Sequence, residues 1–120
     1  MTRLRNRQAA ERRGRWGEAV AALWLRLQGW RILARRVRTP LGEVDLIARR
    51  GRVTLFVEVK TRATAAELDH AIDQHRLSRV AAAAQLLAPR LARPGDDLRI
   101  DVILLAPRTM PRHIRNAWMG

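Results

Sequence analysis

The stretch that most constrains the fold is residues 53–60, VTLFVEVK, in which side chains alternate in character with a period of two. That period is typical of a pleated β-strand, whose successive side chains point to opposite faces. One face is wholly aliphatic or β-branched, and the other carries Glu58 and Lys60. A fold for this chain must therefore bury one face of the strand and place a carboxylate beside an ammonium on the other.

Lys60 is the only lysine among 24 basic residues, all the others being arginine. An ammonium is compact and can shift its pKa near chemistry, whereas a guanidinium stays protonated and planar. Two interpretations are open. Either the lysine is kept for chemistry, or it is a chance residue in an arginine-biased composition.

A second alternating stretch, residues 42–48, reads GEVDLIA and is followed by the short polar connection RRGR at 49–52. Two such stretches joined by a glycine-containing connection predict a β-hairpin. Folding it brings Asp45 near the level of residues 56–58. If the faces match, Glu43, Asp45, Glu58 and Lys60 share one side.

The segment before this hairpin predicts a helix over residues 15–28, ended by Gly29. Its expected core-facing stripe is Trp16, Val20, Leu23, Trp24 and Leu27. Glu18 would lie in the first turn, where a carboxylate suits the helix dipole; the alternative is a carboxylate delivered to a site. Residues 30–34 predict a short strand, and a positive cluster of Arg35, Arg36 and Arg38 precedes a turn at 39–42.

The second half predicts a helix over about 74–88 and a strand over 98–105. Thr64 to Glu67 resembles a capping box and Asp73 is an equally good N-cap. The helix stripe is Val80, Ala83, Ala84 and Leu87, with Pro89 and Pro94 expected to end the helix. The strand is expected to return parallel to residues 53–60, with Asp101 more structural than catalytic. Ile114 and Trp118 are expected to dock the C-terminal piece.

Composition bounds the class of protein. At 120 residues and 48% hydrophobic content the chain predicts one domain over 14–120, with 1–13 as a basic arm, flexible or partly helical. The net charge of +13 favours a polyanionic partner, either nucleic acid or an acidic membrane surface. The absence of cysteine excludes disulfides and thiolate chemistry and suits a cytoplasmic protein. No apolar run is long enough for a membrane span.

Adjacent carboxylates repel and raise one another's pKa unless a cation compensates. Two explanations are open for the hairpin. Its carboxylates could lie on a solvated face and pair with arginines, or Asp45 and Glu58 could hold a hard divalent ion such as Mg²⁺. In the second case Lys60 could orient the attacking water or stabilise charge on a phosphorane.

The pattern resembles a known one. Asp45 followed by Glu58-Val59-Lys60 is similar to the PD-(D/E)XK nuclease superfamily, and the chain resembles the YraN-like family of small bacterial proteins within it. The matching stretches span the chain from Gly14 and are Gly17-Glu18, residues 42–47, residues 56–62, Asp101-Val102 and Asn116-Ala117. The resemblance implies an α/β fold with a restriction-endonuclease-like core, a mixed central β-sheet flanked by helices.

The resemblance also implies roles for residues. Asp45 and Glu58 would bind Mg²⁺, for which Mn²⁺ could substitute, together with the backbone carbonyl of Val59. Lys60 would assist the attacking water, and Glu18 would contribute as in Holliday-junction resolvases. Departures occur at three positions: Val44 replaces a proline of the superfamily pattern, and Arg36 and Arg76 stand where the family often has asparagine and lysine.

The leading hypothesis is a metal-dependent nuclease acting on DNA, with branched or damaged DNA as the expected substrate. The alternative is a nucleic-acid-binding protein that keeps the fold without turnover. The expected partner is nucleic acid, DNA in preference to RNA, and no membrane; relatives similar to resolvases imply a homodimer. The expected phosphate contacts are Arg35, Arg36, Arg38, Arg62 and Arg76.

Overall fold

A five-stranded mixed sheet forms the centre of the molecule in the computed structural model, which describes residues 2–118 and Gly120. The elements in chain order are α1 (Thr2–Leu27), β1 (Arg31–Thr39), β2 (Gly42–Arg50), β3 (Val53–Thr61), the 3₁₀ helix η1 (Ala66–His70), α2 (Gln74–Leu91), β4 (Asp97–Leu105) and β5 (Arg112–Ile114). The strands lie in the order β1-β2-β3-β4-β5. Only the β3–β4 pairing is parallel. The predicted hairpin, the parallel return and the restriction-endonuclease-like α/β class are confirmed.

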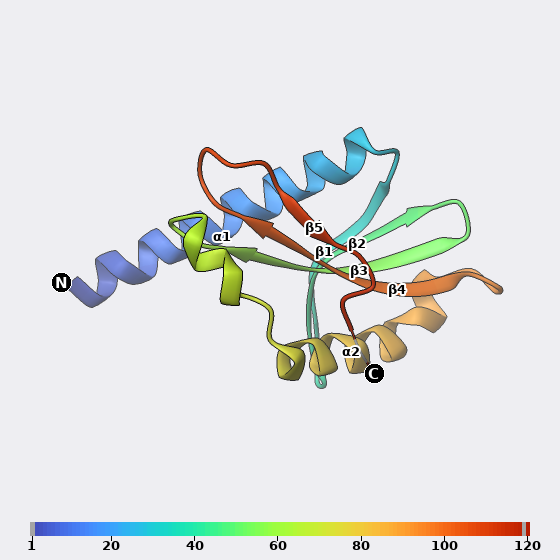
Figure 1. Cartoon of the computed structure of the whole chain (residues 1–120). Coiled ribbons are helices and arrows are strands. Elements are labelled where there is room, and N and C mark those ends of the chain that lie inside the picture. Colours follow the sequence, from blue (N-terminus) through green and yellow to red (C-terminus); the bar gives the residue numbers. More distant parts are fainter. Residues whose placement is uncertain (1, 119) are drawn as a thin grey trace.

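The two long helices cover opposite faces of the sheet (Figure 1). On β3, Leu55 and Val57 pack in the cluster under α1, whereas Phe56 packs in the cluster under α2. The alternation read from the sequence therefore separates two cores, one on each side of a single strand. The charged end of the strand, at Glu58 and Lys60, follows Phe56 on the α2 side because side chains two residues apart share a face.

Helix α1 begins at Thr2, well before the predicted start at residue 15, and its predicted apolar stripe is wrong in part. Trp16, Leu23 and Leu27 are exposed, with Leu27 exposing 76% of its surface. The buried residues are small or lie on a neighbouring face: Gly17, Ala21, Ala22 and Leu25. Large side chains would hold the helix away from the sheet, so the small ones decide which face turns inward.

Gly17 shows how close this approach is. A Cβ added there would lie 2.1 Å from Cγ2 of Thr61 at the end of β3. The close contact fixes the rotation of α1, and the neighbouring Glu18 is half-buried and accepts from Arg36 of β1. Glu18 lies in the middle of the helix, so the expected first-turn role in the helix dipole is wrong.

Helix α2 agrees with prediction at its start and differs at its end. The Asp73 carboxylate accepts hydrogen bonds from the backbone N–H groups of His75 and Arg76, as expected of an N-cap. The alternative cap is wrong, since η1 begins after Ala65 and carries no side-chain cap. The prediction that Pro89 ends the helix is wrong, because the helix continues to Leu91 and the Ala92 N–H donates to the Ala88 carbonyl at 2.8 Å.

The predicted α2 stripe is buried as expected, and Ile114 and Trp118 pack the C-terminal piece against a third core cluster. Asp101 is fully buried in β4 and joins this strand to β5 and the C-terminal piece. Its carboxylate accepts two hydrogen bonds from Arg99 and one from the Asn116 N–H, and lies 2.6 Å from Nε2 of His113. None of the described helices is long and apolar enough to cross a membrane.

Candidate nuclease-like site

Strands β2 and β3 separate at the position of Asp45. Their ladder ends at the pair Leu46–Val57, although both strands continue beyond it. Val44 packs in the cluster under α2, whereas Leu46 packs in the cluster under α1. Two residues this close, two positions apart, would share one face in a regular strand. The alternation is therefore interrupted between them, and Asp45 lies at the interruption.

The Asp45 side chain replaces a backbone acceptor beyond the end of the β2–β3 ladder. Its Oδ2 accepts a hydrogen bond from the Val59 backbone N–H at 2.8 Å, and its other oxygen accepts none from the described residues. A buried N–H without a partner is costly, so the aspartate has a structural reason to point at β3. That bond brings it beside the Glu58-Val59-Lys60 segment, as the hairpin pattern predicts.

Asp45 carries its charge without a partner in an ion pair among the described residues, although the charge of Arg36 acts on it from a longer distance. Burial raises the pKa of Asp45 to about 6, the Val59 hydrogen bond opposes the rise, and the nearby charges of Glu18, Glu58 and Glu43 add to it. None of the described cations forms an ion pair with it. Such a group favours either a proton or an added cation. The charges of Glu18, Glu58 and Glu43 therefore act on Asp45, as expected of carboxylates that lie in one region of the fold.

Glu58 is buried and carries two cations on one oxygen. Arg76 donates from Nε to Oε1 of Glu58 at 2.9 Å, and the Lys60 ammonium lies 3.4 Å from the same atom. Glu58 exposes 3% of its surface, and the Lys60 side chain exposes 12%. The structure thus brings the predicted glutamate and lysine together and adds an arginine from the first turn of α2.

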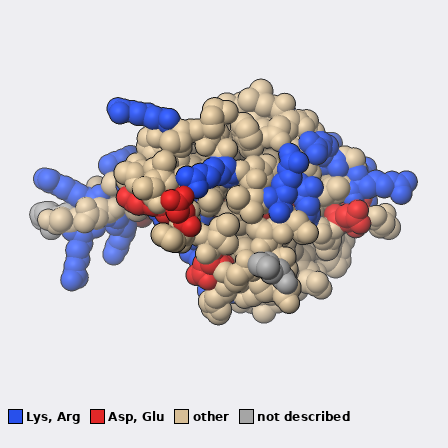
Figure 2. Space-filling model, in the orientation of Figure 1, with Lys and Arg blue, Asp and Glu red and all other residues tan. Residues whose placement is uncertain are grey.

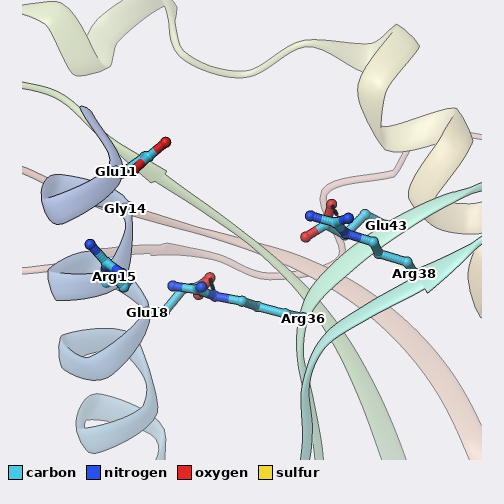
Figure 3. Close-up of a pocket in the computed structure, with 7 residues that line it drawn as sticks. All are labelled: Glu11, Gly14, Arg15, Glu18, Arg36, Arg38 and Glu43. Carbon is cyan, nitrogen blue, oxygen red and sulfur yellow. Dashed lines mark hydrogen bonds and ion pairs between the residues drawn. The ribbon is translucent and has the colours of Figure 1, made fainter. Parts of the chain in front are cut away.

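Glu18 reaches the same region from α1. Arg36 donates from Nε to both carboxylate oxygens, at 2.7 and 2.5 Å, and the two side chains point toward each other in Figure 3. The hydrogen bond to Glu18 raises the pKa of Arg36. Arg36 also has a φ of +50°, a conformation that is uncommon for residues with a side chain. The backbone departs from regular strand geometry at the residue whose guanidinium holds Glu18.

Two cavities flank the β1–β2 hairpin. One of about 370 Å³ lies between α1 and the hairpin and is lined by Glu11, Gly14, Arg15, Glu18, Arg36, Arg38 and Glu43 (Figure 3). The other, of about 220 Å³, is lined by Glu43, Glu58, Arg76, Arg79 and Val80. Glu43 lines both cavities. Glu58 lines only the smaller cavity, Asp45 and Lys60 line neither, and each cavity carries arginines.

The remaining predicted residues are distributed unevenly. Arg38 is exposed, lines the larger cavity and pairs loosely with Glu43 at 3.7 Å. Arg35 and Arg62 line neither cavity, and Arg62 donates to the Thr61 carbonyl at 2.7 Å. The ligand role of the Val59 carbonyl stays a prediction. Arg79 was missed, although its place one helical turn after Arg76 could have indicated it.

The carboxylates of the site are enough for Mg²⁺ but do not form a larger metal-binding cluster. Among residues 2–118 no group of three or more histidine, aspartate or glutamate side chains is gathered as a metal-binding cluster. Mg²⁺, however, is commonly held by one or two carboxylates, with water and substrate phosphate as further ligands. Asp45, which makes no ion pair with a described residue, meets that need beside buried Glu58. These residues would hold the ion, and Glu18 is kept from it by Arg36 unless that pair opens.

Comparison with known proteins places the chain in a family. The pattern of uncharacterised protein family UPF0102 matches residues 17–105. A UPF0102 protein of Erythrobacter litoralis is 67% identical over 112 residues, covering 93% of this chain and 97% of its own. One from Sphingopyxis alaskensis is 65% identical with the same coverage, and one from Rhizorhabdus wittichii is 58% identical over 98% and 99%. The chain therefore belongs to the uncharacterised protein family UPF0102, the YraN family.

Proposed function

We propose that this protein is a metal-dependent endonuclease that hydrolyses phosphodiester bonds in DNA, with branched or damaged DNA as its substrate. The observation that carries the proposal is the carboxylate of Asp45, which makes no ion pair with a described residue and is held on the Val59 N–H at the point where the β2–β3 ladder ends. A half-buried carboxylate with a raised pKa, beside a glutamate and the only lysine, is typical of a functional site.

Each residue has a chemical task in this proposal. Asp45, Glu58 and the Val59 carbonyl would hold Mg²⁺ or Mn²⁺, which polarises a phosphoryl oxygen and lowers the pKa of bound water. Lys60, whose ammonium is directed at Glu58, would orient the attacking water and stabilise negative charge developing on the phosphorus oxygens. Glu18 or Glu43 would complete the carboxylate set from α1 and from the hairpin.

The surrounding arginines would bind the phosphate backbone. Arg36, Arg38 and Arg76 line the two cavities, Arg35 lies in β1, and Arg62 directly follows β3. A guanidinium presents donors that match phosphate oxygens in pairs. The net charge of +13 supports nucleic acid as the partner and DNA as the polymer to test first. A homodimer in the cytoplasm is the assembly we expect to find.

A second function has its own support. Glu58 and Glu18 are each neutralised by an arginine, and Lys60 also lies on Glu58. A protein that only binds nucleic acid could use these pairs as fixed structural contacts. This alternative expects salt-dependent binding to DNA without cleavage at any divalent-ion concentration.

The test is hydrolysis of supercoiled plasmid and of a four-way DNA junction with Mg²⁺ or Mn²⁺, and with EDTA. Wild type is compared with Asp45→Asn, Lys60→Met and the matched control Asp97→Asn, which changes an exposed aspartate at the start of β4. We expect cleavage by wild type and the control, and its loss in the other two. Equal cleavage by all four proteins would indicate a contaminating nuclease and would reject the proposal.

A further inference from the structure

The N-terminal part of α1 extends beyond the sheet (Figure 1). Residues 2–13, here called the arm, are exposed except for Ala9 and Arg13, which are half-buried. The buried residues of α1 begin only at Gly17. The arm is therefore a solvent-exposed extension of a helix that the body anchors further along.

The arm carries positive charge that the rest of the chain does not balance. Its arginines are Arg3, Arg5, Arg7, Arg12 and Arg13, against the single carboxylate Glu11. None of the five forms an ion pair with a described residue, whereas Arg36, Arg76 and Arg99 of the body each hold a carboxylate. In Figure 2 a group of basic side chains projects from the corresponding end of the molecule.

This charge opposes the helix that carries it. The first turn holds no acidic residue, and Arg3 and Arg5 lie near the positive end of the helix dipole. Arg3 and Arg7 are also four residues apart, where like charges repel across one turn. An arm made in this way gains stability when a polyanion lies along it.

The base of the arm leads into the candidate site. Glu11, Gly14 and Arg15 line the larger cavity together with Glu18 and Arg36 (Figure 3). Twelve helical residues span about 18 Å, which corresponds to roughly five base-pair steps of DNA. A duplex following the arm would therefore reach the cavity lined by Glu18 and Glu43 within one turn of its own helix.

We infer that the arm binds the phosphate backbone of double-stranded DNA beside the point of cleavage and directs the duplex into the cavity between α1 and the β1–β2 hairpin. The position of the arm beside a point of cleavage rests on the proposed function, whereas the binding of DNA by the arm does not. An acidic membrane surface fits the arm less well, because Leu4 is its only large apolar side chain and interfacial helices need an apolar face.

The experiment is equilibrium binding of a fluorescent 30-base-pair duplex in EDTA over a series of salt concentrations. An arm variant, Arg3→Gln/Arg5→Gln/Arg7→Gln/Arg12→Gln, is compared with a control that loses the same charge from exposed positions elsewhere, Arg31→Gln/Arg52→Gln/Arg90→Gln/Arg115→Gln. If each arginine contacts one phosphate, the slope of log K against log salt should fall by about 3 to 4 in the arm variant. The slope of the control should fall by less than one.

Equal slope changes in the two variants would show that only net charge matters and would overturn the inference. So would tighter arm-dependent binding to phosphatidylserine vesicles than to the duplex. Amide hydrogen exchange gives a second readout, since exchange in the arm should slow when the duplex binds wild type and not when it binds the arm variant. Binding is measured in EDTA and is therefore independent of cleavage. Arm-dependent binding by a protein that does not cleave DNA when Mg²⁺ is added would reject the nuclease function and support the role of the arm. Cleavage by a protein whose DNA binding does not depend on the arm would support the nuclease function and reject the role of the arm.

Discussion

The carboxylate of Asp45 accepts the backbone N–H of Val59 at 2.8 Å, across two strands that are no longer paired at that level. This bond satisfies a peptide group that the ladder has lost, and it also holds a charged group beside Glu58 and Lys60. The fold thus depends on the same side chain that the proposed chemistry uses. A substitution that removes the charge but keeps the accepting oxygen should therefore raise stability while it abolishes activity.

The first prediction concerns pH. Burial raises the pKa of Asp45 to about 6, above its ordinary value, so the folded state favours the protonated carboxyl. Its stabilising effect is complete below about pH 4 and is lost as the pH rises through 6. At pH 7.5 Asp45→Asn should then be more stable than wild type by on the order of 2 kcal/mol, because the neutral amide keeps an oxygen for the Val59 N–H.

Urea unfolding from pH 4 to pH 8 measures this difference. The advantage of Asp45→Asn should shrink to nothing near pH 4, where wild type is protonated, and Asp97→Asn should match wild type throughout. Added Mg²⁺ should stabilise wild type and not Asp45→Asn at pH 7.5. A variant less stable than wild type at pH 7.5 would show that the charge of Asp45 is compensated in solution.

The second prediction concerns Arg76, which lies in the first turn of α2 and donates from Nε to Oε1 of Glu58 at 2.9 Å. If Arg76 exchanges Glu58 for a substrate phosphate, Glu58 loses one of its two cations, and can accept a metal ion, only when DNA is present. Arg76→Gln should therefore raise the affinity for Mn²⁺ without DNA by about tenfold, the equivalent of one charged hydrogen bond. It should also weaken DNA binding.

Calorimetric titration of Mn²⁺ into the DNA-free protein measures this effect. Arg79→Gln is the matched control, since Arg79 lines the same cavity and has the same charge but makes no ion pair with a described residue. General electrostatics would change both variants alike. Only a larger gain for Arg76→Gln supports the exchange.

Much of the candidate site could be predicted because it follows from local patterns. Alternation gives the two strands, and the short connection at 49–52 sets their pairing, so Asp45 must come near Glu58 and Lys60. The arginine clamps could not be foreseen, because they join elements far apart in the chain. Arg36 holds Glu18 from β1 and Arg76 holds Glu58 from α2.

The rotation of α1 is the clearest error, and its cause is steric. Counting large apolar residues selects Trp16, Leu23 and Leu27, all of which are exposed. The buried face is set by the close approach of Gly17 to Thr61, which depends on the position of β3. A hydrophobic pattern reports which side chains favour burial, whereas the distance between two layers decides which ones fit.

The third prediction tests that approach. Gly17→Ala should destabilise the protein by about 1 to 3 kcal/mol, because its methyl would lie 2.1 Å from the Thr61 side chain. Gly14→Ala is the control in the same helix, with no atom within 4 Å of the added carbon. It should be neutral or stabilise by up to about 1 kcal/mol through helix propensity.

Thermal unfolding of the two variants and of Gly17→Ala/Thr61→Ser measures both effects. Serine at position 61 lacks the methyl that the new Cβ would meet. The stability lost through Gly17→Ala should therefore be much smaller when it is measured against Thr61→Ser than when it is measured against wild type. If Gly17→Ala were as stable as Gly14→Ala, the helix would not be held against the end of β3 as the structure has it.

The last prediction separates a structural carboxylate from those of the site. Burial opposes ionisation of Asp101, but its hydrogen bonds with His113, Arg99 and the Asn116 N–H outweigh that effect and lower its pKa. Its stabilising effect is therefore present above the ordinary aspartate pKa and is lost as the pH falls through the lowered folded value. Asp101→Asn should lose about 3 to 5 kcal/mol at pH 7, since it breaks a buried ion pair, and should show a weaker loss in acid than wild type.

Asp69→Asn is the matched control, because Asp69 also accepts from an arginine at 2.9 Å but lies on the surface. Its cost should stay below about 1 kcal/mol. Chemical unfolding at pH 7 and pH 3 measures both variants, and DNA cleavage is assayed below their unfolding temperatures. We expect folded Asp101→Asn to keep its cleavage rate, because Asp101 ties β4 to β5 and the C-terminal piece, whereas a stable protein that no longer cleaves would place Asp101 in the site with Asp45 and Glu58.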